Sequence, residues 1–313
     1  MTITTKFILF QVLIWFPLIM GSIISHKKPS IEQSIGKVVS FNLVTFEPVV
    51  VFWSIWGLSL SADMIALPLA GILTVLIGLI TGYVLIGVLK FNGVQKHTFI
   101  ISSSLANHGF TMGGFLCYLF LGIEGLGLAM LFIVYFMPYL VLVIFSYARY
   151  VSEDPLQQFS LKNYIINKKN FPFYAVLLAL LFQMLGIKRI TAPVPVDLFI
   201  AISVMIYYFS LGTSFSPGNI KKFLPAHAVL AIVKFMIVPL IVIVVAFVIP
   251  IGEKVRAVII IQSFMPAAIY SVVTSILFRL DSRMASSLFV FNTVLFLFVV
   301  LPLLFTFRAL FIP

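Results

Sequence analysis

The chain has 313 residues, of which 62% are hydrophobic and only 9% are charged. Soluble domains carry about 25% charged residues, so this composition excludes a soluble enzyme or binding domain and indicates a polytopic membrane protein. The net charge of +11 does not point to nucleic acid, because the basic residues lie in short loops between apolar runs, as membrane orientation requires. The single cysteine, Cys117, lies within an apolar run, which excludes a disulfide framework.

Ten apolar runs follow one another along the chain. A membrane-spanning helix needs about 20 predominantly apolar residues, and runs of roughly this length cover residues 7–24, 38–57, 65–89, 98–120, 125–148, 171–187, 194–214, 226–249, 255–278 and 285–307. The first run follows Lys6 as a signal peptide would. It exceeds the ~7–15-residue core of such a signal, however, so we expect a retained helix. The sequence predicts an all-α membrane protein with ten transmembrane helices.

A polar stretch divides these spans into two sets of five. We predict a first five-helix repeat at 1–150, a cytoplasmic linker at 151–170 and a second repeat at 171–313, all in one membrane domain. Proline positions in the two halves match at a slowly growing offset: Pro68 with Pro225 at 157 residues, and Pro138 with Pro302 at 164. Because five is odd, the second repeat must cross the membrane upside down, as in alternating-access carriers.

The loops also predict the orientation. Of the 20 Lys and Arg residues, 13 fall on one side of the predicted membrane, 6 fall on the amino-terminal side, and Lys234 lies within the eighth span. Cytoplasmic loops carry the excess of basic residues, so both termini are expected outside. We expect Lys234 to extend its ammonium group to the membrane surface, as lone membrane lysines do, with an ion pair to Glu47 as the alternative.

The fourth and ninth spans contain helix breakers at mid-membrane. Such breaks persist in lipid only where they line a cavity, and a matching pair in two halves is the best sequence indication of a carrier's binding site. The breaks at Asn107 and Pro266 lie 159 residues apart. We therefore predict that the two broken helices cross and that substrate binds at residues Asn107, His108, Gly109, Gly113, Gly114, Gln262, Ser263 and Pro266. The positive end of each second half-helix favours a carboxylate-bearing substrate.

Two ionisable residues within the spans are candidates for ion coupling. Glu47 precedes Pro48 in the second span, and His108 lies in the fourth-span break. Ionisable groups in membrane spans are functional candidates by default. Each also has a structural interpretation: Glu47 as a buried acceptor that stabilises the Pro48 kink, and His108 as a partner of backbone freed by the glycines. The sequence leaves both open.

The sequence lacks the motifs of several other classes of protein. No GxSxG, HExxH or Walker motif is present, and no nucleophile–base pair is visible. We therefore expect no enzyme, no cofactor and no metal site.

Three stretches carry a resemblance to a known family: NHGFTMGG at 107–114, FMPAAIYS at 264–271, and LFRLDSRMASSLFVFNTVLFLFVVLPL at 277–303. Together with the ten spans they resemble the auxin efflux carrier family, in its bacterial members, within the bile-acid:sodium symporter-like superfamily. The best matches are Asn107, Gly109 and Pro266. Gly114 takes the place of the family's first proline and Met112 the place of a glycine, and Glu47 stands where an uncharged residue is usual.

The resemblance implies a five-plus-five inverted repeat with two crossing broken helices. It also implies transport of small organic anions, such as auxin in plants and dicarboxylates in some bacteria. We expect a secondary carrier of the plasma membrane that moves a small organic anion by alternating access, linked to protons through Glu47 and His108. Sodium coupling of the bile-acid symporter type and a non-transporting receptor on the same scaffold are the alternatives. The sequence allows a homodimer.

Overall fold

The computed structural model describes residues 3–28, 31–89, 91, 93–152, 167, 170–191, 194–213 and 221–312. Over these residues the secondary structure is helical, apart from an isolated bridge between Ala106 and Ala267. Seven segments are long and apolar enough to cross a bilayer: Phe7–Lys27, Ser34–Trp56, Ala62–Leu89, Phe110–Val151, Val196–Thr213, Lys221–Val248 and Ser282–Thr306. The predicted helical class and multi-pass membrane character are confirmed. Most of the predicted linker at 151–170 lies outside the described residues.

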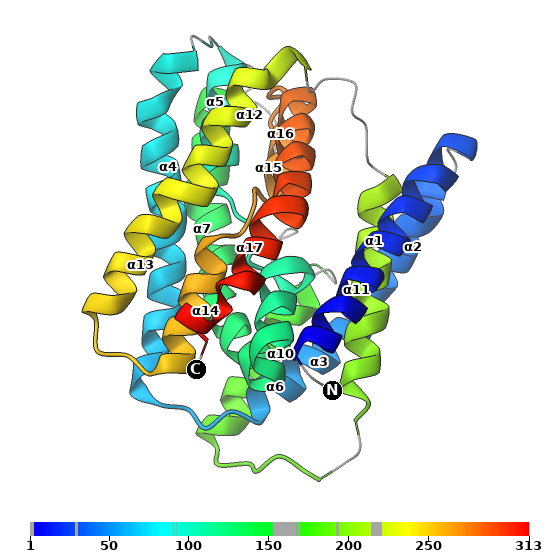
Figure 1. Ribbon diagram of the computed structural model, residues 1–313, viewed down its shortest axis with the longest axis vertical. Coiled ribbons are helices and arrows are strands. Elements are labelled where there is room, and N and C mark those ends of the chain that lie inside the picture. The colour runs from blue at the N-terminus through cyan, green and yellow to red at the C-terminus, as the bar shows by residue number, and fades with distance from the viewer. Residues whose placement is uncertain are drawn as a thin grey trace. The chain divides into compact units, whose positions relative to one another are not determined.

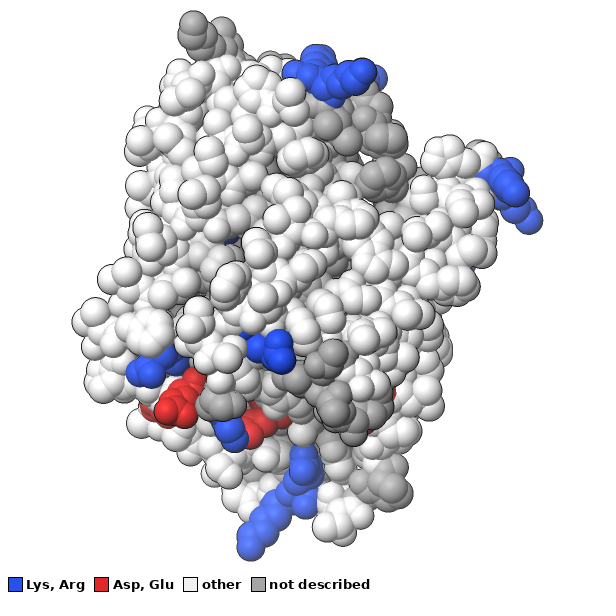
Figure 2. All heavy atoms as spheres, viewed as in Figure 1, with Lys and Arg blue, Asp and Glu red and all other residues white. Residues whose placement is uncertain are grey.

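The surface of these helices suits lipid. Large apolar side chains point outward from many of them, including Leu69, Ile80 and Val84, and also Leu240 and Phe247. Figure 2 shows that uncharged side chains form most of the face in view. An aqueous surface would not leave so many large apolar groups exposed, whereas the hydrocarbon core of a membrane solvates them.

The chain forms two compact units. Unit 1 consists of Met1–Ser61, Gly109–Leu131 and Ser160–Phe215. Its helices are α1 (Ile3–Lys27), α2 (Ile31–Val44), α3 (Phe46–Trp56), the π-helical turn η2 (Phe110–Gly114), most of α6 (Phe115–Phe132), α10 (Phe171–Met184) and α11 (Val196–Thr213). Within this unit α1 runs beside α11 (Figure 1). Gly21 lies against the backbone of Phe209 and Gly212 against that of Leu18, so both helices use small residues to approach closely.

A proline separates α2 from α3. Pro48 lacks an N–H, and its ring would clash with the carbonyl four residues earlier in a continuous helix. The helix accordingly breaks at Thr45, where φ is −122° and ψ is −80°. The break places Glu47 in the first turn of α3.

The 42-residue segment Phe110–Val151 is about 60 Å long if drawn as a straight helix, about twice the thickness of a hydrocarbon core. It turns at Gly122, whose φ of 69° and ψ of −158° are not helical and are readily adopted only by glycine. The segment is therefore two helices joined at Gly122.

Unit 2 consists of Ala62–His108, Phe132–Phe159 and Ser216–Pro313. Its longer helices are α4 (Ala66–Leu89), α5 (Val94–Ser104), α12 (Leu224–Ile232), α13 (Val238–Val248), α14 (Glu253–Ser263), α15 (Ile269–Leu277) and α16 (Ser282–Leu295). Shorter elements complete it: η1 (Ala62–Ile65), η3 (Ile133–Tyr135), α7 (Phe136–Tyr139), η4 (Leu140–Phe145), α8 (Ser146–Val151), η7 (Lys221–Phe223), η8 (Val233–Ile237), η9 (Phe296–Val300), α17 (Leu301–Thr306) and η10 (Arg308–Leu310).

Helices α4 and α5 are in close contact within unit 2. The position of a Cβ on Gly78 would overlap the carbonyl of Ser103, and one on Gly82 would overlap the Ser103 side chain. Small residues thus bring the backbone of α5 against α4. This contact fixes the end of α5, which leads directly into the break after Ser104.

Prolines within the long helices of unit 2 stand beside π-helical turns. Turn η8 precedes Pro239, η9 precedes Pro302, and η4 follows Pro138. Proline removes one backbone donor and displaces the carbonyl four residues earlier, so the turn before it widens; this accounts for η8 and η9 but not for η4, which follows its proline. Such turns occur frequently at functional sites.

Candidate functional site

Two helix breaks meet in unit 2. Helix α5 ends at Ser104. Helix α14 ends at Ser263 and α15 begins at Ile269, so five residues separate these two helices. The backbone N–H of Asn107 donates to the backbone carbonyl of Pro266 at 2.8 Å, and the backbone N–H of Ala268 donates to the backbone carbonyl of Leu105 at 3.1 Å. These two bonds form the antiparallel bridge of Ala106 with Ala267. Each break thus satisfies backbone groups that the other leaves free, as an apolar environment requires.

Side chains from two other helices complete the backbone pairing. Asn292 of α16 accepts the amide hydrogen of Ala267 through Oδ1 at 2.8 Å. Lys234 of η8 donates to the carbonyls of Ser104 at 3.2 Å and Leu105 at 3.0 Å. The meeting point of the two breaks, here called the crossing, is therefore held by the Asn292 side chain beside α14 and α15 and by the Lys234 ammonium group at the end of α5.

His108 is fully buried beside the crossing. Its Nδ1 lies 2.6 Å from the hydroxyl of Tyr135, and its ring meets the edge of Phe132 at a centroid distance of 5.0 Å. Gln262, also fully buried, donates from Nε2 to the backbone carbonyl of His108 at 3.2 Å. His108 Nε2 and Gln262 Oε1 have no hydrogen-bond partner among the described residues. Buried polar atoms nearly always have a hydrogen-bond partner, so a buried atom without one requires an explanation. A bound ligand that bonds these two atoms would be such an explanation.

Most of the predicted site residues lie in unit 2. Asn107, His108, Gln262 and Pro266 lie together at the crossing. Ser263 is buried nearby, but its hydroxyl bonds the carbonyl of Ile260 on its own helix at 2.7 Å.

The three glycines of the predicted site follow His108 along the chain and belong to unit 1. Gly113 and Gly114 lie in η2, where the amide of Gly114 bonds the carbonyl of Gly109, five residues earlier, at 2.9 Å. The glycine-rich stretch is therefore a widened helical turn. The complete break precedes it, between Ser104 and Gly109.

The prediction for Lys234 is wrong. Its side chain is 2% exposed and bonds carbonyls of the crossing, so it does not extend to the membrane surface. The last carbonyls of a helix lack intrahelical donors and form its negative end. The carbonyls at the end of α5 therefore serve as buried acceptors for the ammonium group of Lys234. A single helix surrounded by lipid would have no such acceptors beside its lysine.

Tyr135 and Tyr139 are two further residues beside this site that are not among the predicted ones. Their hydroxyls reach His108 Nδ1 and Ser104 Oγ, the latter at 2.7 Å. They are four residues apart and therefore share a helix face. Two tyrosines with this spacing in an otherwise apolar span were the available signal.

The other coupling candidate, Glu47, lies in unit 1. It is 7% exposed, and its carboxyl group accepts a hydrogen bond from the hydroxyl of Tyr207 on α11. One turn away, Ser203 donates to Asn42 Oδ1 at 2.7 Å, while Asn42 Nδ2 has no partner among the described residues. Glu47 thus belongs to a buried polar cluster between α2–α3 and α11.

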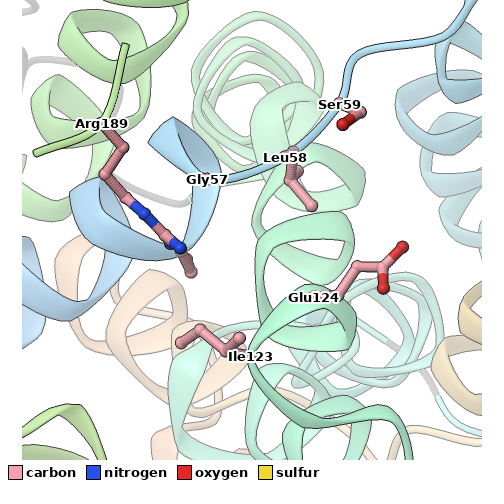
Figure 3. A pocket seen from close by; sticks show the side chains of 7 residues that line it. Gly57, Leu58, Ser59, Ile123, Glu124 and Arg189 are labelled. Carbon is pink, nitrogen blue, oxygen red and sulfur yellow. The ribbon is translucent and has the colours of Figure 1, made fainter. Parts of the chain in front are cut away.

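Unit 1 also contains a pocket of about 290 Å³ that none of the predicted residues lines. Its lining residues are Ser54, Gly57, Leu58, Ser59, Ile123, Glu124 and Arg189. Figure 3 shows the Arg189 side chain extending alongside the end of α3, with Glu124 on a different helix. The guanidinium group lies over the Trp53 ring at 5.1 Å and its Nη1 lies 3.4 Å from the Trp53 carbonyl. These contacts fix Arg189 against α3.

No protein-family model matches the chain, and no curated protein matches it. The resemblance to the auxin efflux carriers therefore rests on the sequence stretches quoted above.

Proposed function

We propose that the chain is a secondary carrier for a small organic anion, of the auxin efflux carrier type, in a bacterial plasma membrane. It has ten spans in a five-plus-five inverted repeat, with both termini outside, and works by alternating access with a proton as the coupling ion. The observation that carries this proposal is the pair of broken helices whose breaks bond each other at Asn107 and Pro266. Broken helices that meet at mid-membrane form the binding sites of secondary carriers.

Helix lengths support the ten-span plan. Helices α5 and α14 have 11 residues each, about 16 Å, and neither crosses a hydrocarbon core of about 30 Å by itself. Each is completed after its break, α5 by η2 with the first part of α6, and α14 by α15. The separation of Phe110–Val151 at Gly122, the broken span α14–α15 and the short α10 raise the seven long segments to ten, with α5 counted together with the first part of Phe110–Val151.

The charge of the crossing supports an anionic substrate. Lys234 is buried, and its hydrogen-bond partners in the described part of the chain are carbonyl groups rather than carboxylates. Its positive charge is therefore not neutralised by an acidic side chain. Helix α15 adds the positive end of its dipole at Ile269, directly after the crossing. A carboxylate would be attracted by both.

The unpaired atoms support a substrate with both donors and acceptors. His108 Nε2 and Gln262 Oε1 are buried polar atoms without partners among the described residues. A hydroxy-carboxylate of a few carbons could donate to Gln262 Oε1 and also bond His108 Nε2, whereas a simple hydrocarbon acid has no donor for Gln262 Oε1. A small polar carboxylate is therefore the preferred substrate class.

An uptake screen tests the proposal. The purified protein in proteoliposomes is offered radiolabelled mono- and dicarboxylates, with an imposed proton gradient, an imposed sodium gradient, or neither. We expect uptake of at least one small carboxylate, driven by the proton gradient. Gln262→Leu should weaken it by about tenfold, because it removes both polar atoms at similar size. Ser275→Ala is the control, since that hydroxyl bonds only the carbonyl of Ser271 on its own helix.

Three results would contradict the proposal or part of it. Uptake driven by a sodium gradient at fixed pH would show that sodium, and not the proton, is the coupling ion. Tight binding of a carboxylate with no uptake under any gradient would indicate a receptor. Absence of both binding and uptake over the whole screen would reject an organic-anion carrier.

A further inference from the structure

We propose that the Lys234 ammonium group is a tethered cation that occupies a monovalent-cation site at the helix crossing. The inference deepens the proposed function, because it explains how a carrier of this kind would work without binding sodium. Removing the ammonium group should therefore uncover a site that takes sodium from solution.

The backbone directs Lys234 inward. The residue lies in the π-helical turn η8, five residues before Pro239. The widened turn changes the angular position of its residues relative to a regular helix. Lys234 is 2% exposed, whereas Met236 in the same turn is 64% exposed. The turn therefore presents the one charged residue of this helix to the protein interior and an apolar residue to the outside.

The partners of Lys234 are those of a bound cation. The ammonium group donates to two consecutive carbonyls, Ser104 O at 3.2 Å and Leu105 O at 3.0 Å. They lie at the carboxyl end of α5, where helical carbonyls carry partial negative charge and lack helical donors. Carbonyl oxygens at the ends of broken helices coordinate the coupling ion in several carriers.

More oxygen atoms gather around the same turn. The Ser104 hydroxyl lies 3.0 Å from the carbonyl of Val75 and 2.7 Å from the hydroxyl of Tyr139. Gln262 Oε1, whose own amide nitrogen bonds the His108 carbonyl, is a buried oxygen without a partner in the described chain. The crossing is therefore rich in oxygen and has one positive charge.

An ion pair does not account for the buried charge. Within the described residues, Lys234 has two carbonyl partners and no carboxylate partner. A structural ammonium group that only capped α5 would use the same two bonds. The two readings differ when the ammonium group is removed, because only a cation site will bind an ion in its place.

The test uses the purified full-length chain in detergent, without substrate. Thermal unfolding is measured in sodium chloride and in choline chloride at equal ionic strength for wild type, Lys234→Ala, Lys234→Arg and Lys234→Met. We expect the wild type and Lys234→Arg to unfold at the same temperature in both salts. In choline chloride, Lys234→Ala should unfold at a lower temperature than wild type. In sodium chloride its unfolding temperature should rise by roughly 3 °C or more and level off at high sodium concentration, because an ion that binds only the folded state stabilises that state. Lys234→Met fills the space and should not respond.

Asn292→Ala is the matched control. It removes a buried hydrogen bond of the same crossing without changing a charge, so its unfolding temperature should fall equally in both salts. Methylammonium should also rescue Lys234→Ala, since it restores the missing group. If Lys234→Ala does not fold, Lys234→Ser, which also leaves the space beside the carbonyls open, is measured in its place and should gain the sodium response.

Two results would overturn the inference. Equal stabilisation of wild type and Lys234→Ala by sodium would show that the ammonium group does not occupy the ion's place. The absence of a sodium response in both Lys234→Ala and Lys234→Ser would leave Lys234 a helix cap. Because no substrate is present, a failed uptake screen rejects the carrier and leaves this result unaffected.

Discussion

The amide of Asn107 donates to the carbonyl of Pro266 at 2.8 Å, and this bond connects two helix breaks that are 159 residues apart in the chain. Pro266 has no N–H of its own, so it contributes to the pairing only as an acceptor. The neighbouring Ala268 supplies the reciprocal donor to Leu105 at 3.1 Å. The crossing thus depends on a residue that cannot continue α14 and on a segment, 105–109, that does not continue α5.

Pro266→Ala should reduce transport while the protein still folds. Alanine restores an N–H and favours extension of α14 into the break, which competes with the bond from Asn107. We expect uptake to fall by about tenfold or more at equal amounts of protein, with little change in unfolding temperature. Pro225→Ala is the control, since that proline lies in the first turn of α12, where proline is tolerated. Equal uptake by both variants would show that the break does not need its proline.

The two breaks could be predicted from the sequence because each is a local feature. A proline, or Asn-His-Gly, inside an apolar run long enough to cross a bilayer is visible without a structure. The division of each unit among distant segments was not visible, nor were the partners of the charged groups. Glu47 meets Tyr207, 160 residues later, and Lys234 meets carbonyls 129 and 130 residues earlier. Such pairs depend on which helix faces pack together, and composition gives no information on that.

Gly78→Ala should destabilise the protein, and Gly87→Ala should not. Both glycines lie in α4, but a Cβ on Gly78 would overlap the carbonyl of Ser103, whereas a Cβ on Gly87 meets nothing within 4 Å. Over-packing of this kind typically costs about 1–3 kcal/mol, and alanine is a better helix former than glycine by up to about 1 kcal/mol. Thermal unfolding in detergent should show a lower midpoint for the first variant alone. A reversed order would contradict the α4–α5 contact.

Asn292→Ala should destabilise the protein, and its neighbour Thr293→Val should not. Alanine at 292 removes the acceptor of the Ala267 amide, and a buried unsatisfied N–H costs about 1–3 kcal/mol. The hydroxyl of Thr293 is buried without a partner in the described chain, so valine removes an unpaired polar group at similar volume and should be neutral or stabilising. The unfolding midpoints of both variants, compared with wild type, measure this. A loss of stability in Thr293→Val as large as that in Asn292→Ala would mean that the hydroxyl has a partner.

Glu47→Gln should preserve folding and abolish the dependence of transport on a pH gradient. Glutamine keeps an oxygen that accepts the hydrogen bond from Tyr207, so the contact of α3 with α11 survives. It cannot carry a proton, and a carrier that used Glu47 for coupling would equilibrate its substrate without accumulating it.

Two tyrosine variants separate coupling from folding in unit 1. Tyr207→Phe removes the donor to Glu47 and should change the pH dependence of uptake. Tyr208→Phe, at the next position, removes a hydroxyl with no hydrogen bond in the described chain and should behave as wild type. The measurement is substrate accumulation in proteoliposomes with an imposed pH gradient of either sign, alongside counterflow without a gradient. Counterflow in the same vesicles shows whether the Glu47→Gln variant is active. If an active variant accumulates substrate as well as wild type does, Glu47 is not part of the coupling mechanism. His108 is then the remaining candidate predicted from the sequence.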